Sequence, residues 1–183
     1  GVAMRSRICV DLALPSAIWK CVVRQRLSEE DLASFDVHAY HFVKHLSGIY
    51  KRIKTAGSTS EAALAAEEAS AILQDLTWSA VLSDGSVVDL RESGRHQPVE
   101  VEGLGEYLTK YVQARLQENA EATEAFREGL VSVIPENALT VLQWNELQSL
   151  VCGASVIDID RLRKNTEYDE DVSPQDAHIQ MFW

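Results

Sequence analysis

The sequence has no long hydrophobic run and no pattern typical of a secretory signal. No apolar stretch among its 183 residues approaches the roughly 20 residues that a membrane-spanning helix needs. Residues 4–7 are basic in part but lead into only a short apolar stretch, unlike a signal peptide. We therefore expect a cytoplasmic protein, with the nucleus as the alternative, that does not bind membranes.

Cysteine is scarce, and its spacing is unlike that of a cross-linked or zinc-binding protein. Cys9, Cys21 and Cys152 are odd in number and widely spaced, and no C-x-x-C occurs. This pattern predicts free thiols in a reducing compartment. Cys152 is a candidate nucleophile, but it ends an apolar helical pattern without a neighbouring base or cation, where a thiol packs like a small hydrophobe. We interpret it as a packing residue and expect no catalytic residue in this chain.

The sequence also has few basic residues relative to acidic ones. Lys and Arg number 17 against 28 Asp and Glu, which gives a formal net charge of -11. Nucleic acids need a basic surface, so this balance argues against nucleic-acid binding and is better matched to a basic partner. The glycine-rich motifs of phosphate binding and the G-x-S-x-G motif of serine hydrolases are absent as well.

Two groups of residues have part of the pattern of a metal site. His38, His41 and His45 share one helical segment, and His41 and His45 form an i, i+4 pair that suits zinc, but no third ligand has diagnostic spacing. Asp169-Glu170-Asp171 lacks the glycine and the final Glu of an EF-hand calcium loop. We interpret both groups as solvated surface and expect no metal or other cofactor. A metal-dependent enzyme at the histidines is kept as an alternative.

Hydrophobic periodicity predicts a mainly helical chain with one small sheet. Apolar residues recur at steps of three and four, which predicts helices from Pro15, over 37–53, 61–73, 104–116, 122–133 and 144–151, near 159–162, and from Ser173-Pro174. In the helix over 122–133, Ala125, Phe126 and Leu130 are expected to face inward. Strands are expected over 76–82 and 87–90, with a turn between them and a short third strand over 99–101. The predicted fold class is α+β.

Four groups of residues, taken in order, resemble one known family. They are Leu14-Pro15 with Trp19-Lys20 and Asp31-Leu32; Leu76-Thr77-Trp78 with Val88-Asp89-Leu90; Phe126-Arg127-Glu128-Gly129 with Leu150-Val151-Cys152-Gly153; and Thr166-Glu167-Tyr168 with Phe182-Trp183. Each group alone is a weak signal, but the ordered set covers nearly the whole chain. The chain resembles the later part of the N-terminal lobe of HECT-type E3 ubiquitin ligases.

The resemblance implies a mostly helical N-lobe portion with a small antiparallel sheet in an E2-binding subdomain. Residues 1–30 would belong to the large subdomain, residues 31–119 to the small subdomain that binds the E2 enzyme, and residues 120–183 would return to the large one. The chain would end before the C-terminal lobe that carries the catalytic cysteine. Cys152 matches a packing cysteine of the family, not that thioester site.

The resemblance also implies a groove for the E2, lined by Phe42, Val43, Leu46, Leu76, Tyr107 and Tyr111. Spacing alone favours another interpretation, because most of these residues lie on regular apolar helical faces that are also typical of a core. The chain departs from the family at Val101-Glu102-Gly103-Leu104, where an Asn is usual, and in the additional Ala-rich segment 61–73. These departures concern the groove contacts and not the family.

Ligases of this family take ubiquitin from a charged E2 onto their own cysteine and then onto a substrate lysine. By resemblance, this chain docks the E2, and its partners are the E2, ubiquitin and a protein substrate bound through regions outside the sequence. The alternative is a degenerate HECT remnant that acts as a non-catalytic scaffold in a larger assembly. A following lobe with a Leu-Pro-x-x-x-x-Cys pattern would distinguish the two.

Overall fold

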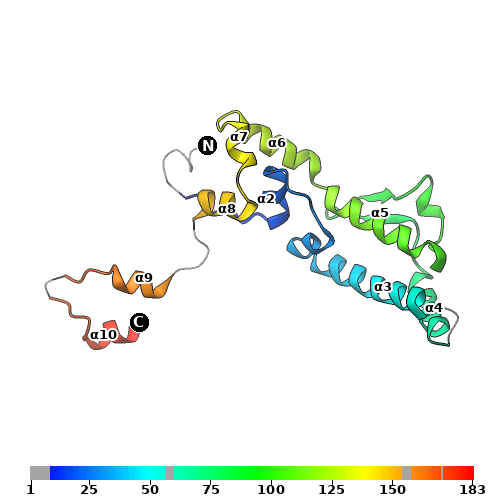
Figure 1. The fold of residues 1–183 in the computed structure, drawn as a ribbon, viewed down its shortest axis with the longest axis horizontal. Helices are drawn as coiled ribbons and strands as arrows, with labels where there is room; N and C mark the ends of the chain where they lie inside the picture. Colours follow the sequence, from blue (N-terminus) through cyan, green and yellow to red (C-terminus); the bar gives the residue numbers. More distant parts are fainter. Residues whose placement is uncertain (1–8, 57–59, 154–157, 170) are drawn as a thin grey trace.

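Helices form most of the structure, a computed structural model that describes residues 9–56, 60–153, 158–169 and 171–183 (Figure 1). The longer helices are α3 (Val37–Ala56), α4 (Ser60–Leu73), α5 (Leu104–Gln117) and α6 (Ala120–Val131). Shorter helices are α2 (Ser16–Val22), α7 (Glu136–Thr140), α8 (Trp144–Cys152), α9 (Ile159–Lys164) and α10 (Ala177–Phe182), with 3-10 turns η1 (Glu29–Ser34), η2 (Gly94–His96) and η3 (Val101–Gly103). With strands β1 (Ser79–Val81) and β2 (Val87–Asp89), the predicted α+β class is confirmed.

The predicted antiparallel hairpin is confirmed, but the third strand is not. In the hairpin, Ala80 of β1 lies opposite Val88 of β2. The strand expected over 99–101 is replaced by a single bridge between Thr77 and Pro98. The bonds from the Trp78 N–H to the Gln97 carbonyl and from the Val99 N–H to the Leu76 carbonyl, both 3.0 Å, flank this bridge, and the chain then turns into η3. The expectation of a third strand is therefore wrong.

The start of α9 and the end of α8 lie where the sequence indicates them, whereas the start of α10 does not. The Asp158 carboxylate accepts a backbone N–H of the first turn of α9 at 2.9 Å, and Gly153 ends α8 with a φ of 86°. The expected start of the last helix at Ser173-Pro174 is wrong. The Asp176 carboxylate accepts the Ser173 N–H at 2.9 Å and closes a turn there, so α10 begins only after Asp176.

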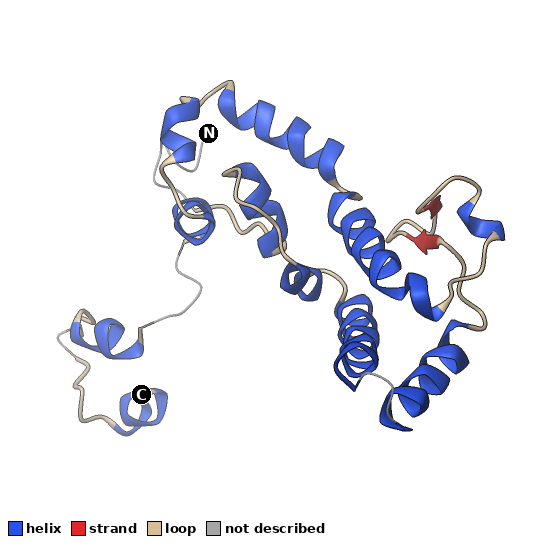
Figure 2. Cartoon of the chain, turned by 45° about the vertical axis from the view of Figure 1, so that its right-hand side comes forward, coloured by secondary structure: helices blue, strands red, loops and turns tan. Residues whose placement is uncertain are grey.

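Buried hydrophobic side chains form two separate clusters. The first core joins α3, α4 and α5 to the hairpin region and comprises Leu32, Val43, Leu46, Ile49, Ala65, Ala69, Leu73, Trp78, Val99, Leu104, Tyr107 and Leu108. The second core joins α2, α7 and α8 and comprises Trp19, Val22, Val23, Ile134, Leu139, Leu147 and Val151. The same division is visible in the ribbon, where α3, α4, α5 and the hairpin lie to one side of α2, α6, α7 and α8 (Figures 1 and 2).

The inward face of α6 differs from the prediction. Of the three residues expected to face inward, Ala125 and Phe126 are exposed, and only Leu130 packs against the second core. Thr123 and Arg127 are buried in their place. Arg127 Nε donates to the last carbonyl of α2 at 3.1 Å, so the Arg127 face of α6 lies toward α2.

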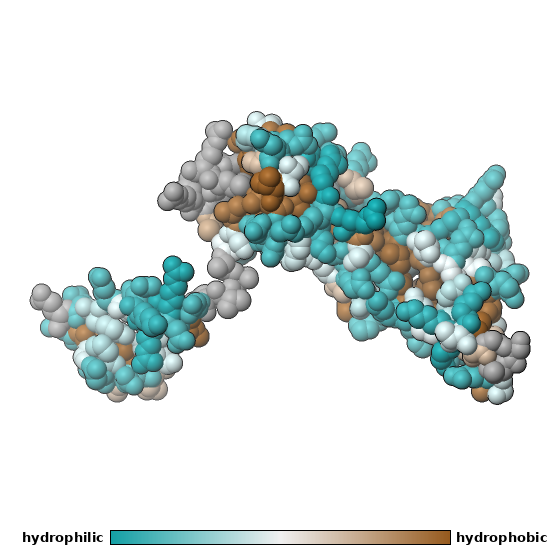
Figure 3. Space-filling model, in the orientation of Figure 1, coloured by the Kyte–Doolittle hydropathy of each residue, from teal (hydrophilic) through white to brown (hydrophobic). Residues whose placement is uncertain are grey.

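Some hydrophobic surface stays uncovered. On the face shown in Figure 3, hydrophobic side chains reach the surface between α3 and α5 and over α2 and α8. In α9 and α10, which lie apart from the other helices in Figure 1, Ile159, Leu162, Met181 and Phe182 are exposed. Among the helices of the described ranges, none combines the length and the apolar character that crossing a bilayer requires.

Candidate functional site

Five of the six residues predicted to line a groove lie on α3 and α5, and Leu76 precedes β1. The two helices run antiparallel. Asp36, just before α3, pairs with Arg115 near the end of α5, whereas Tyr50 near the end of α3 meets Gly105 at the start of α5. A Cβ on Gly105 would lie 2.7 Å from Tyr50 ring atoms, so the glycine allows the helices to approach this closely.

Four aromatic side chains form a continuous row across this helix pair. The ring of Phe42 lies 5.6 Å from that of Tyr111, Tyr111 lies 5.8 Å from Tyr107, and Tyr107 lies 5.9 Å from Trp78. These separations are typical of favourable aromatic contacts. Burial raises the pKa of Tyr107, and the neighbouring Tyr111 adds to the shift. Tyr107 is thus a neutral packing residue in the middle of the row.

The six residues gather in one cluster but differ in burial. Val43, Leu46 and Tyr107 are 0%, 0% and 1% exposed and belong to the first core. Phe42, Leu76 and Tyr111 are half-buried and pack against that core; we call these three the apolar edge. Of these six residues, only the three of the apolar edge offer side-chain surface to a partner, and the role of all six as an E2 groove stays a prediction.

A buried ion cluster behind the apolar edge was not anticipated from the sequence. Arg115, with a side chain 5% exposed, pairs with Asp36 at 2.8 Å and with Glu118 at 2.9 Å. A signal for it was present, because position 115 continues the helical series of Leu108 and Tyr111 on the buried face of α5. A charged residue on such a face is rarely buried without a partner.

The charges in this cluster stabilise each other. Burial raises the pKa of the Asp36 carboxyl, but hydrogen bonds from the Ala39 N–H and from Arg115 outweigh burial and hold the pKa below its ordinary value. Burial lowers the pKa of Arg115, whereas Asp36 and Glu118 raise it, and the net shift is upward. Asp36 and Arg115 are therefore both charged at neutral pH.

Comparison with known proteins identifies the family. A sequence model of the HECT-domain (ubiquitin-transferase) family matches residues 1–183. The chain belongs to the HECT family. The resemblance noted from the ordered groups of residues is thereby confirmed.

Several HECT ligases are similar to this chain over its whole length. The Homo sapiens protein "Probable E3 ubiquitin-protein ligase HECTD4" is 31% identical over 190 residues, which cover 100% of this chain and 5% of that protein. "E3 ubiquitin-protein ligase RSP5" of Saccharomyces cerevisiae is 27% identical, covering 100% of this chain and 21% of that protein. "E3 ubiquitin-protein ligase HERC2" of Homo sapiens is 28% identical, covering 100% and 3%. The HECT chain thus spans about a fifth or less of these relatives.

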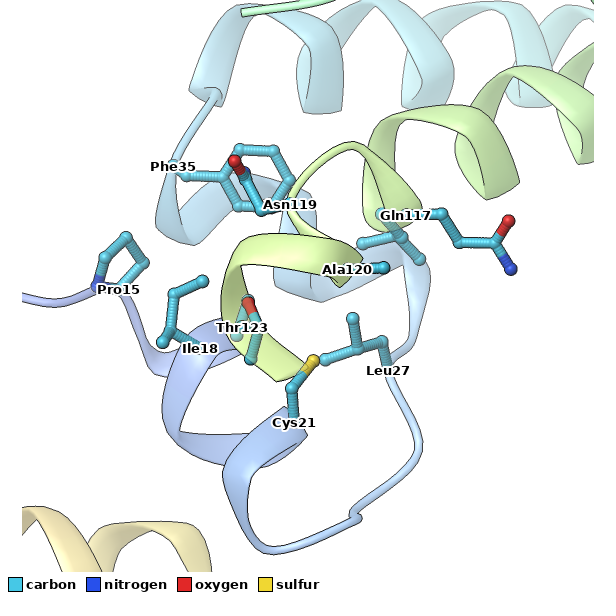
Figure 4. A pocket seen from close by; sticks show the side chains of 11 residues that line it. Pro15, Ile18, Cys21, Leu27, Phe35, Gln117, Asn119, Ala120 and Thr123 are labelled. Carbon is cyan, nitrogen blue, oxygen red and sulfur yellow. The ribbon is translucent and has the colours of Figure 1, made fainter. Parts of the chain in front are cut away.

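An apolar cavity of about 150 Å³ lies where the two cores of the HECT chain meet. Residues of α2, the end of α5 and the start of α6 line it together with Phe35, and the Cys21 thiol lies near Leu27 and Thr123 (Figure 4). Burial raises the pKa of Cys21, and the charge of Asp31 raises it further, so this thiol is a weak nucleophile. The cavity has the chemistry of a packing gap and not that of a catalytic site.

The other candidate residues of the HECT chain form no reactive arrangement in its described part. Cys152 is half-buried, and its thiol donates to the Leu12 carbonyl at 3.7 Å. The three histidines of α3 are exposed. Within the described ranges, no group of three or more His, Cys, Asp or Glu residues is placed to hold a metal ion. Glu170, part of the acidic group considered as calcium ligands, lies outside the described residues.

Proposed function

We propose that this chain is the E2-docking part of the N-terminal lobe of a HECT ubiquitin ligase. Its apolar edge, Phe42, Leu76 and Tyr111, binds a ubiquitin-charged E2. The observation that supports this is that three large hydrophobic side chains pack against a well-buried core and are themselves only half-buried, and that two of them, Phe42 and Tyr111, are in contact. Large side chains that pack against a core on one side and are accessible to a partner on the other supply most of the binding energy at protein interfaces.

The division into subdomains belongs to the same proposal. Residues 31–119 form the E2-binding subdomain, and residues 1–30 and 120–183 form part of the large one. The two cores support this division, since the first core draws its residues from 32–108 and the second from 19–23 and 134–151. A docking unit with its own core keeps the shape of its binding surface independently of the rest of the chain.

The contribution of this chain to ubiquitin transfer is proximity. The carbonyl carbon at the ubiquitin C-terminus leaves the E2 sulfur for a ligase cysteine, and then leaves that cysteine for a substrate lysine. The cysteine and its acid–base partners come from a separate lobe, and the substrate binds through other regions of the protein. By holding the E2, this chain makes the first transfer effectively intramolecular. Transfer takes place in the cytoplasm or the nucleus.

The test is alanine substitution at the apolar edge in the complete HECT domain. Phe42→Ala and Tyr111→Ala are each compared with the parent domain by calorimetric titration with the E2 that discharges fastest onto it. Loss of an interface anchor commonly costs about 2 kcal/mol, so the Kd should rise about thirtyfold. Circular dichroism and the melting temperature show whether each variant is still folded.

Two kinds of control separate docking from folding. Phe126→Ala removes an exposed aromatic side chain from α6 and should change neither affinity nor folding. Val43→Asp and Tyr107→Ala alter buried residues and should damage the fold and the affinity together. If Phe42→Ala and Tyr111→Ala fold and bind the E2 normally, the apolar edge is not the docking surface, and the scaffold alternative becomes the better account.

A further inference from the structure

A single buried guanidinium joins three elements of the unit around the first core. Arg115, on α5, donates from Nη2 to Asp36 at 2.8 Å and to Ser83 Oγ at 3.1 Å, and from Nε to Glu118 at 2.9 Å. Asp36 precedes α3, and Ser83 follows β1 at the hairpin turn. The Ser83 N–H also donates to Glu118 at 3.2 Å. The start of α3, the hairpin turn and the end of α5 are thus held at one point.

Such a cluster is an inefficient way to stabilise a fold. The side chains of Arg115 and Glu118 are 5% and 4% exposed, so both charges have lost most of their contact with water. Hydrophobic residues of similar volume often give equal or greater stability than a buried ion pair. A guanidinium instead supplies directional geometry, because its N–H groups lie in one plane at fixed angles. This points to a role in setting the distance between elements.

Arg115 lies next to Tyr111 of the apolar edge. Tyr111 is four residues before it, one turn away on the same face of α5, and the Tyr111 ring contacts Phe42 of α3 at 5.6 Å. Asp36 also accepts the Ala39 N–H at 2.8 Å, so the carboxylate that Arg115 binds is anchored to the first turn of α3. The ion pair therefore links α3 and α5 at the end where Phe42 and Tyr111 meet.

We propose that Arg115 is a positioning residue for E2 docking, which holds Phe42 and Tyr111 at the separation the E2 requires by binding Asp36. Glu118, bound at Nε, and Ser83, bound at the same Nη2 as Asp36, restrict the guanidinium further, so that it stays directed at Asp36. The contact of Arg115 with the Tyr111 side chain, one of the interactions that raise the pKa of Arg115, agrees with this role. The inference rests on the proposed function. The experiment below distinguishes a failure of the inference from a failure of the proposed function.

Arg127 provides a matched control. It is as deeply buried as Arg115, at 4% against 5% exposed, and pairs with the Glu136 carboxylate at 2.5 Å. It lies beside the second core, away from the apolar edge. Replacing either arginine with methionine keeps an unbranched apolar stem and removes the charge. Both changes leave polar partners unpaired, so both should lower the melting temperature of the domain.

The measurement is the E2 affinity of the complete HECT domain, at a temperature where circular dichroism shows each variant to be folded. Arg115→Met should weaken binding about tenfold. Asp36→Asn, which keeps the side-chain size and weakens the same pair, should act in the same direction and replaces Arg115→Met if that variant does not fold. Arg127→Met should leave the affinity unchanged. In a Phe42→Ala background, Arg115→Met should have a much smaller effect, because both changes act on one surface.

Each contrary outcome has a distinct meaning. If Phe42→Ala weakens E2 binding while Arg115→Met and Asp36→Asn do not, the positioning role is wrong and the proposed function stands. Equal losses in Arg115→Met and Arg127→Met, or fully additive effects of Arg115→Met and Phe42→Ala, also overturn it, because general destabilisation then explains the loss. If Phe42→Ala and Tyr111→Ala bind the E2 normally, the proposed function fails and the positioning role fails with it.

Discussion

At the scale of single residues, the tightest approach to the backbone is at Gly94. A Cβ built on Gly94 would lie 2.1 Å from the Trp78 carbonyl oxygen. That oxygen also accepts the Leu90 N–H at 2.8 Å, so moving it disturbs the hairpin. We predict that Gly94→Ala lowers the free energy of unfolding by about 1–3 kcal/mol, the usual cost of overpacking, as measured by urea denaturation.

Gly129 is the control for this prediction. It lies inside α6, and a Cβ there would have nothing within 4 Å. Alanine is the better helix former by about 1 kcal/mol, so Gly129→Ala should raise the stability. A Gly94→Ala variant as stable as the parent would contradict the close contact with Trp78.

At the scale of elements, the orientation of α6 has a measurable consequence. Phe126, which helical spacing had placed in the core, is 36% exposed, whereas Leu147 of α8 is 0% exposed. We predict that Leu147→Ala lowers the free energy of unfolding by about 2–5 kcal/mol, because it leaves a cavity in the second core. Phe126→Ala should cost less than about 1 kcal/mol. Urea denaturation of both variants tests this, and a larger loss for Phe126→Ala would mean that α6 is turned the other way.

At the scale of the whole molecule, we predict that this chain accepts no ubiquitin on Cys152. The thiol is half-buried and donates to the Leu12 carbonyl, so it is poorly placed to attack an E2 thioester. Incubation with E1, E2, ubiquitin and ATP should therefore give no conjugate that a reducing agent removes on gel electrophoresis. Cys9→Ser is the matched control, because Cys9 is the exposed thiol of the three. A reducible conjugate that persists in Cys9→Ser and disappears in Cys152→Ser would overturn the prediction.

Local patterns were sufficient for most of the secondary structure. The helical period located α3, α5 and α8, and β-forming residues on both sides of a turn signal located the hairpin. The turn into η3, which ends the third strand after a single bridge, was not foreseen. The start of α10 and the inward face of α6 could not be predicted from these patterns either. They involve the hydrogen bonds of Asp176 with Ser173 and of Arg127 with Val22, and helical spacing does not specify these partners.

At the candidate site, local sequence patterns predict which residues share a helix face but not which of them are buried. Helical spacing placed Tyr107 and Tyr111 on one face of α5, and this much follows from the sequence. Which of the two stays open depends on packing, since the Trp78 ring covers Tyr107 at 5.9 Å and leaves Tyr111 half-buried at the edge. Likewise, Arg115 was visible as a charge on a buried face, but its partner Asp36 is 79 positions away in the chain. A helical period determines which side chains share a face, whereas burial and ion pairing depend on contacts between distant segments. Membership of the HECT family is therefore readable from residue order, while the apolar edge and the cluster behind it exist only in the folded chain.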